Sequence, residues 1–407
     1  GLDWGDKCHW VCLRCEGSQA EELFALEQQP AAIHQWVAQL RLRFGGRRVA
    51  IALEQSRGAL LYALIQYDFL VLFPVNPKAF HSYRQALRLS GAKNDPSDAQ
   101  LLLQFVSTHR EQLKPWYPEA AQTRSLRLFV EQRRKLVEDR TRLSNRLTQQ
   151  LKEYFPPVLQ WFRDLTNPSA LEFLTRWPTL EKARRAQTRT LEKFFRSHRY
   201  SLQSTQEKIR EVRVAIPLTQ DPAILEVHPR MVHNWIQQLQ ILQTSIAELE
   251  QQIASHMQEH SEAFIFESFP GAGPAVAPRL LVAYGSDRER FDARRMQCLS
   301  GIAPVTEQSG NSRWVHHRFV CSKFLKQTFH EFAQCSIPHS IWANAYYRQQ
   351  REKGASQHEA IRALAYRWIR IITSCWQQRT TYCEELYLES LRRRGSPLIK
   401  RIEAQAA

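Results

Sequence analysis

Several features of membrane, secreted and disulfide-rich proteins are missing from this sequence. It holds 8 cysteines among 407 residues, too few for a disulfide scaffold, so we expect reduced thiols. Its longest apolar run, Phe69 to Val75, falls short of the roughly 18 residues of a membrane span. No signal-peptide pattern is visible. The chain opens at Gly1 rather than Met, which is compatible with further residues before Gly1. These absences predict a soluble, cytoplasmic protein of about two or three domains, with no membrane partner.

Positive charge dominates the composition, and most of it is arginine. The chain has 56 Lys+Arg against 40 Asp+Glu, a formal net charge of +16, and 43 of the cations are Arg. With 43% hydrophobic residues, the chain is not disordered throughout. A well-solvated basic surface would account for the charge. The spread of arginine, which makes forked contacts with phosphate, favours a nucleic-acid partner instead.

One cysteine cluster resembles a metal site by its spacing alone. Cys8, Cys12 and Cys15 have the C-x3-C-x2-C spacing that iron–sulfur radical enzymes use. The residues around them alternate between apolar and polar, as in a half-buried strand, and a strand would splay such ligands apart. We therefore expect strand cysteines that pack as small hydrophobic side chains.

Residues 1–109 alternate between strand-like and helix-like patterns, which predicts an α/β domain. A strand is expected from Leu2 through Leu13. The other expected elements are a helix from about Glu21, strands at 48–54 and 69–75, helices at 58–67 and after Pro77, and a helix from 95 to about 106.

Residues 110–262 are predicted to be helical, with two long helices at Glu119–Tyr154 and about His228–Glu259. Their apolar residues recur at helical spacing, so the two helices are expected to pair as an antiparallel coiled-coil arm that makes a dimer or spaces two domains. Arginines on the arm, Arg133 and Arg146 among them, are candidates for contacts with nucleic-acid phosphates. Residues 263–390 form a further helical module, and 391–407 a loose basic tail.

Four carboxylates stand out by position. Asp3 lies within the first strand and Glu54 closes the second, while Asp95 and Asp98 lie three residues apart at a helix start. Oxygen ligands arranged in this way can hold two Mg²⁺ ions, or Mn²⁺, which clamp the reacting oxygens of a phosphodiester. Helix capping by Asp95 and an ordinary strand end at Glu54 are the alternatives.

The last module contains two motifs that suit phosphate. Residues 269–277 form a Gly-rich turn between helices, and Gly271 and Gly273 would let backbone N–H groups approach phosphate, as in a helix-hairpin-helix element. A plain helix–helix turn is the alternative. Further on, Ser309 and Ser312 offer exposed hydroxyls that could attack phosphorus. The cations that follow them, Arg313, Arg318 and Lys323, would attract the phosphate; the alternative is that these serines are ordinary loop residues.

Taken in order, these motifs resemble the DEDD transposases of bacterial insertion sequences. The resemblance is carried by the strand Asp, Glu54-Gln55-Ser56-Arg57-Gly58, Asn94-Asp95-Pro96-Ser97-Asp98-Ala99 and the Arg-rich helix ending at Ser144-Asn145-Arg146-Leu147. It continues through Phe269 to Pro274, Gly301-Ile302-Ala303-Pro304 and Gln308-Ser309-Gly310, so it covers nearly the whole chain.

The resemblance implies an N-terminal domain of the RuvC type, with an RNase H fold whose acids bind Mg²⁺. It implies a C-terminal serine, best matched by Ser309, that links covalently to a DNA end during strand exchange. Some members are bridge-RNA-guided recombinases, which form dimers and tetramers around a structured noncoding RNA that pairs with target and donor DNA. By that likeness, the acids of one subunit would form a composite site with Ser309 of another subunit. The protein would act on DNA in the nucleoid.

Two other functions remain open from the residues alone. A RuvC-like junction resolvase or nuclease would need the four acids but not Ser309, since it would hydrolyse DNA with water. A non-catalytic nucleic-acid-binding protein would use its carboxylates only for capping and solvation, so it would bind DNA or RNA equally well without Mg²⁺.

Overall fold

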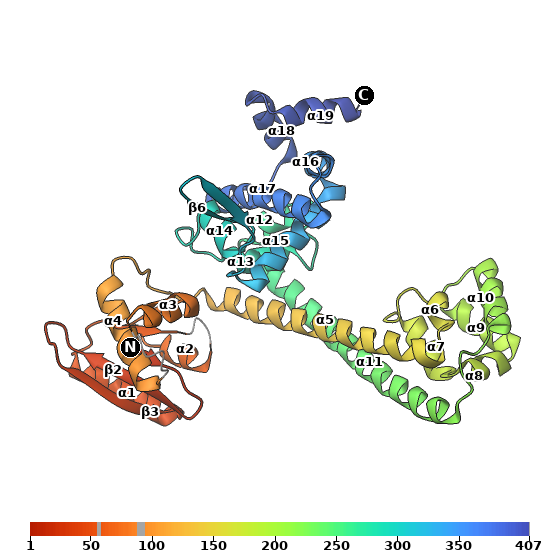
Figure 1. Ribbon diagram of the computed structural model, residues 1–407, viewed down its shortest axis with the longest axis horizontal. Coiled ribbons are helices and arrows are strands. Elements are labelled where there is room, and N and C mark those ends of the chain that lie inside the picture. The colour runs from red at the N-terminus through yellow and green to blue at the C-terminus, as the bar shows by residue number, and fades with distance from the viewer. Residues whose placement is uncertain (55–57, 88–93, 407) are drawn as a thin grey trace. The chain divides into compact units, whose positions relative to one another are not determined.

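Two units make up the chain in the computed structural model, Gly1–Glu119 and Ala120–Ala407. The structure describes residues 1–54, 58–87 and 94–406, and Figure 1 shows the elements of each unit. Gln55, Ser56 and Arg57, the middle of the Glu-x-Ser-x-Gly motif, lie outside the described residues. No helix in the described ranges combines the length and the apolar character needed to cross a bilayer.

The first unit is built on a five-stranded sheet in the order β3-β2-β1-β4-β5. β1 pairs antiparallel with β2, and β2 with β3, whereas β1 pairs parallel with β4, and β4 with β5. The elements are β1 (Leu2–Asp3), β2 (Cys8–Arg14), β3 (Glu21–Glu27), α1 (Pro30–Arg43), β4 (Val49–Leu53), α2 (Ala59–Leu64), β5 (Leu70–Pro74), α3 (Pro77–Leu87) and α4 (Asp95–His109).

Helices cover both faces of this sheet. On one face, Leu2, Val11 and Leu53 pack against buried residues of α1 and α2, such as Trp36 and Leu61. On the other face, β4 contributes Ala52 to a cluster with α3 and α4, and β2 contributes Cys12 to a cluster with Ala99 and Leu103 of α4. The alternation of strands and helices therefore produces an α/β unit, as expected.

Two local predictions in this unit are wrong. The strand expected from Leu2 through Leu13 is two antiparallel strands joined at a tight turn, where a Cβ on Gly5 would lie 2.3 Å from the Cys8 carbonyl oxygen. The helix expected from about Glu21 starts only at Pro30, because Glu21–Glu27 pairs along its whole length with β2. The ladder satisfies these backbone groups, so tertiary pairing overrides the local helical pattern. Cys8 and Cys12 do lie in a strand, as predicted.

The second unit contains two long helices, α5 (Ala121–Tyr154) and α11 (Pro222–Glu259), which pair antiparallel as predicted. The Thr123 hydroxyl lies 2.9 Å from the His260 imidazole, which follows α11, so the start of α5 meets the end of α11. The second helix starts at Pro222, earlier than the predicted His228, and Pro222 occupies the first turn of α11. A proline is tolerated there because the first N–H groups of a helix have no intrahelical partner.

Between these helices the chain forms a small helical bundle with a core of its own. Its helices are α6 (Val158–Trp161), α7 (Pro168–Arg176), α8 (Leu180–Arg185), α9 (Thr188–Ser197) and α10 (Leu202–Val214). Aromatic side chains dominate the core, with Phe173, Phe194 and Phe195 fully buried and in mutual ring contact. The core continues onto Leu147 of α5 and Leu239 of α11.

The last part of the second unit is a helical module around three buried tryptophans, Trp342, Trp368 and Trp376. Its elements are α12 (Ala263–Glu267), α13 (Ala277–Tyr284), α14 (Ala293–Leu299), β6 (Val305–Ser309), β7 (Ser312–His316), α15 (Lys323–Ser336), η1 (Ile337–His339), α16 (Ile341–Glu352), α17 (Gln357–Gln378), α18 (Glu384–Arg393) and α19 (Pro397–Ala406). The expectation of a loose tail is wrong. α19 is a helix whose Leu398 and Ile399 are buried in this core, so apolar burial anchors its first turn.

Candidate functional site

Asp3 and Glu54 lie at neighbouring positions of the sheet. β1 and β4 run parallel with Leu2 opposite Leu53, so each carboxylate comes one residue after a paired leucine. Leu2 and Leu53 face the core beneath α1 and α2. Since successive strand residues point to opposite faces, Asp3 faces the side that α4 covers, while Glu54 directly follows the last residue of β4. Asp3 is buried and Glu54 half-buried.

Asp98 lies on that covering helix and is completely buried. Its Oδ2 accepts a hydrogen bond from Nη1 of Arg84 on α3, at 2.7 Å. Its Oδ1 is also buried and has no hydrogen-bond partner among the described residues. A buried carboxylate oxygen normally has a partner, so an orphaned one marks a place for a proton donor or a cation.

Asp95 differs from Asp98, although both start the same helix. It is exposed at the first position of α4, and the residue before it, Asn94, is the N-cap. The capping alternative therefore does not describe Asp95, and Asn94 makes no side-chain cap hydrogen bond. The three-residue spacing places one carboxylate against the sheet and leaves the other toward solvent.

The carboxylates suit a hard cation by their chemistry, but they are not gathered around one point. Within the described ranges, no three His, Cys, Asp or Glu side chains are spaced to hold a metal ion. What fits Mg²⁺ is the oxygen donor set and the orphaned Oδ1 of Asp98. The guanidinium of Arg84 already places a positive charge on the other oxygen.

Ser309 and Ser312 lie opposite each other at the tip of the β6–β7 hairpin. Between them, Gly310 has a φ of +55°, whereas Asn311 is not among the residues with positive φ. This is the pattern of a type II′ turn, which needs Gly at its first central position. Both serines are exposed, as expected, and they share one face of the hairpin because paired residues point to the same side.

The three cations expected near Ser309 and Ser312 have different positions and contacts. Arg313 pairs with Gln308, one step from the Ser309–Ser312 pair, so it points to the opposite face of the hairpin. Arg318 donates to the carbonyl oxygens of Ala303 and Pro304 at the base of the hairpin, at 3.4 and 3.5 Å. Lys323 is exposed at the start of α15.

The glycine turn has a packing role at one of its two candidate positions. Gly271 has a φ of +77°, and a Cβ there would lie 2.4 Å from the Cys335 carbonyl oxygen at the end of α15. Only glycine fits both requirements. Gly273 is exposed, with nothing within 4 Å of an added Cβ, so its backbone alone remains open for a phosphate.

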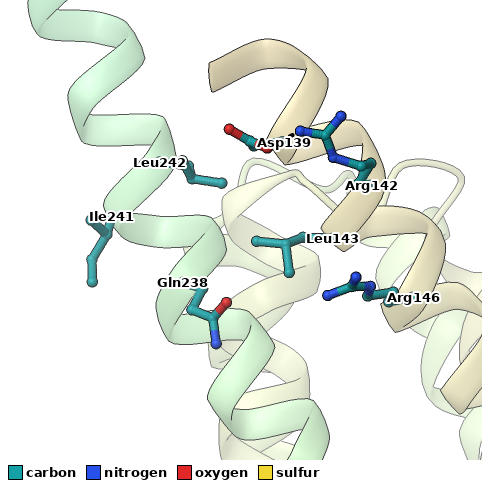
Figure 2. A pocket seen from close by; sticks show the side chains of 7 residues that line it. All are labelled: Asp139, Arg142, Leu143, Arg146, Gln238, Ile241 and Leu242. Carbon is teal, nitrogen blue, oxygen red and sulfur yellow. Dashed lines mark hydrogen bonds and ion pairs between the residues drawn. The ribbon is translucent and has the colours of Figure 1, made fainter. Parts of the chain in front are cut away.

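The two arm arginines also differ. Arg133 of α5 donates through Nε and Nη2 to Glu250 of α11, at 2.9 and 2.5 Å, so it joins the paired helices. Arg146 is exposed and lines a hollow of about 430 Å³ between α5 and α11 (Figure 2). Figure 2 shows Leu143, Leu242 and the end of Arg146 directed toward the space between the two helices.

Sequence reasoning missed two features of these sites. Nothing in the sequence links Arg84 to Asp98, because their contact exists only once α3 packs beside α4. The β6–β7 hairpin, in contrast, has a signal: a Gly-Asn pair separates two alternating runs, which predicts a two-residue turn.

Comparison with known proteins gives matches at both ends of the chain. A family model described as "Transposase" matches residues 1–156, and one described as "Transposase IS116/IS110/IS902 family" matches residues 263–348. The "Mini-circle putative transposase for IS117" of Streptomyces coelicolor is 30% identical over 346 residues, 83% of each chain. The "Insertion element IS900 uncharacterized 42 kDa protein" of Mycobacterium paratuberculosis is 23% identical over 391 residues, 94% of this chain and 96% of that one.

These matches define an enzyme of the DNA transposase class, which acts on DNA. The chain belongs to the IS116/IS110/IS902 transposase family.

Proposed function

We propose that this transposase cuts and exchanges DNA strands through a covalent serine–DNA intermediate, with Mg²⁺ held by its N-terminal carboxylates. The observation that carries the proposal is the edge where Asp3 and Glu54 leave neighbouring parallel strands, together with the orphaned oxygen of buried Asp98. The strand order, with three antiparallel strands followed by two parallel ones, supports an RNase H/RuvC-like fold for residues 1–109.

In this proposal Asp3, Glu54, Asp95 and Asp98 are the ligands of Mg²⁺, with Mn²⁺ as a substitute. A bound Mg²⁺ would polarise the scissile phosphate and favour the ionised form of the attacking hydroxyl. Asp98 would bind through Oδ1, while Arg84 holds Oδ2 and so fixes the plane of the carboxylate. Asp95 lies at the exposed start of α4, so its place in the donor set is proposed from the sequence motif rather than from its position.

Ser309 would be the nucleophile. Its Oγ forms a bond to phosphorus as the bond from phosphorus to the 3′ oxygen breaks, and the serine proton is released while the departing 3′ oxygen gains one. The phosphoserine link keeps the energy of the phosphodiester, so a 3′ hydroxyl can later reverse the step. The exposed tip of the hairpin supports this role, because it leaves the hydroxyl accessible to a strand.

The test is to trap the covalent link with labelled DNA on a denaturing gel. Ser309→Ala should abolish the adduct and recombination while leaving DNA binding, and Ser312→Ala is the matched control, since it lies directly opposite on the same face. A full adduct from Ser309→Ala together with loss from Ser312→Ala would move the role to Ser312. Cutting without any adduct in the unaltered protein would support the resolvase alternative.

We also propose a structured noncoding RNA as a partner, and a dimer or tetramer as the active form. The basic composition supports an RNA partner, and the long α5–α11 pair, proposed here as a coiled coil, supports assembly. The test is to purify the protein from cells that carry its flanking DNA and to sequence any RNA that accompanies it. One discrete RNA with loops matching nearby DNA is expected. Its absence would place target choice on the protein.

A further inference from the structure

The β6–β7 hairpin and the segment after it expose large aromatic side chains. Trp314 is 62% exposed and Phe319 is 79% exposed. The ring of His316 contacts both of them. Its centroid lies 4.5 Å from that of Trp314, at an interplanar angle of 35°, and 6.4 Å from that of Phe319, at 22°. Aromatic rings exposed together to water do not gain the free energy that burial of apolar surface provides. Such a group therefore marks a surface that binds a partner.

Two hydrogen-bond contacts hold the middle ring in place. His316 Nε2 lies 3.0 Å from the Glu307 carboxylate, and Nδ1 lies 3.0 Å from the His317 carbonyl oxygen. Both acceptors need a proton on the imidazole, so the two bonds together favour the charged form. The Glu307 carboxylate, followed by the His317 carbonyl, raises the pKa of His316. The contact between this ring and Trp314 restricts the orientation of the indole.

The aromatic group lies on the same face of the hairpin as the candidate nucleophile. Ser309 pairs with Ser312 and Glu307 pairs with Trp314, two steps apart along the strands, so all four side chains point to one side. The indole therefore stands about 7 Å along the strand from the serine pair. That spacing suits a base next to the phosphate that the serine would attack.

The charge around the group suits nucleic acid. Residues 308–330 contain four Lys or Arg and no Asp or Glu, and Glu307 is engaged with His316. Exposed rings in a basic segment are the usual composition of a site that stacks unpaired bases, because the rings take the bases and cations of the segment take the phosphates. A duplex hides its base faces in its own stack, so the site suits a strand whose bases have been unpaired.

We propose that Trp314, together with His316 and Phe319, is a stacking platform for an unpaired DNA base. This base would lie next to the phosphate that Ser309 attacks, on the same strand. This rests on the proposed function of Ser309 for its location, although the stacking itself does not need the covalent step. The platform would hold the strand so that its phosphate lies over the hairpin tip during exchange. Trp314 is thus a binding and positioning residue.

The test measures binding of the full chain, with any RNA that copurifies, to a single-stranded DNA oligonucleotide carrying the cleavage sequence. It uses Ser309→Ala protein so that no covalent link forms. Trp314→Ala should weaken binding roughly 5- to 150-fold, the range for loss of one stacked base, whereas Trp314→Phe keeps most of the affinity. Val315→Ala is the matched control, because Val315 is also exposed but lies on the opposite face.

Abasic substitutions, moved one position at a time along the oligonucleotide, identify the stacked base. At one position beside the cleavage site, removing the base should abolish the difference in DNA affinity between the parent protein and Trp314→Ala. This is the result that a double-mutant cycle gives for two groups in contact. Equal affinities of Trp314→Ala and the parent would overturn the proposal. A change of oligomeric state in Trp314→Ala without a change in DNA affinity would also overturn it, and would assign the surface to a second copy.

Failure of the proposed serine role looks different. If Ser309→Ala still forms the adduct but Trp314→Ala loses binding at one base, the platform stands and the nucleophile is elsewhere. If the serine role holds and the Trp314 variants bind normally, only the platform is refuted.

Discussion

Arg84 and Asp98 form a buried ion pair in which Nη1 of the guanidinium lies 2.7 Å from Oδ2 of the carboxylate. The Asp98 side chain is 1% exposed and the Arg84 side chain 17%. The pair joins α3 to the helix that covers the candidate metal ligands, so it bears on both stability and the site.

Removing the Arg84 charge should destabilise the N-terminal unit. Arg84→Met leaves a buried carboxylate without its cation, and we expect the free energy of unfolding to fall by about 3–5 kcal/mol. Hydrogen exchange of the β4 amides in increasing urea measures this loss. Arg41→Met is the control, because its pair with Asp68 is exposed and should cost no more than about 1 kcal/mol. Combining Arg84→Met with Asp98→Asn should recover part of the loss; equal losses for Arg84→Met and Arg41→Met would refute the argument.

The carboxylates should be needed for chemistry but not for DNA binding. Asp3→Asn, Glu54→Gln and Asp98→Asn should each lower strand transfer on the order of 100-fold or more, the scale for losing charge stabilisation of a transferring phosphoryl group. Chelation with EDTA should stop the reaction, and Mg²⁺ or Mn²⁺ should restore it. Glu27→Gln, an exposed carboxylate on the edge strand β3, is the control. Strand transfer that is unaffected by EDTA would exclude the metal proposal.

The two turn glycines should respond in opposite ways to alanine. Gly271→Ala puts a Cβ 2.4 Å from a backbone oxygen at a φ of +77°, which should cost roughly 2–4 kcal/mol of unfolding free energy. Gly273→Ala meets open space and ordinary φ, so its effect should stay within about 1 kcal/mol. Urea unfolding followed by the fluorescence of the buried tryptophans compares the two variants, and a stable Gly271→Ala protein would contradict the packing explanation.

The charge of His316 should depend on Glu307. Because the folded-state pKa of His316 is raised by Glu307 and the His317 carbonyl, the imidazolium persists to a higher pH than in an unfolded chain. Any stability it contributes is present at low pH and is lost as pH rises through the folded-state pKa. Glu307→Gln should lower that pKa, and an NMR titration of the His316 ring protons measures the change. An identical titration in Glu307→Gln would show that the hydrogen bond has no effect on the charge.

The arm arginines should differ in how they affect DNA binding. Arg146 is exposed, so Arg146→Ala should reduce the slope of log affinity against log salt by about 0.9 if it contacts a duplex phosphate. Arg133 is held by Glu250, so Arg133→Ala should leave that slope nearly unchanged and instead loosen the α5–α11 pair. Fluorescence anisotropy at several salt concentrations separates them. Equal slopes for the two variants would remove Arg146 from the interface.

Patterns along the chain were enough for the long elements. The α5–α11 pairing was predicted because apolar residues recur at helical spacing from Phe129 to Leu151 and from Ile236 to Met257. Short elements were less predictable. Glu21–Glu27 reads locally as the start of a helix, but its pairing with β2 decides its conformation, because a complete ladder outweighs a weak local preference.

The sequence by itself determined which residues could do the chemistry: carboxylates at strand and helix ends, serines beside a glycine, and arginine in excess. Only the tertiary structure decided their environments. Asp98 is buried against Arg84 while Asp95 faces solvent, and Gly271 is fixed by a carbonyl more than 60 residues away. Trp314 shares a face with Ser309, whereas Arg313 does not. Burial and charge pairing depend on neighbours that are distant in sequence, so no local pattern could specify them.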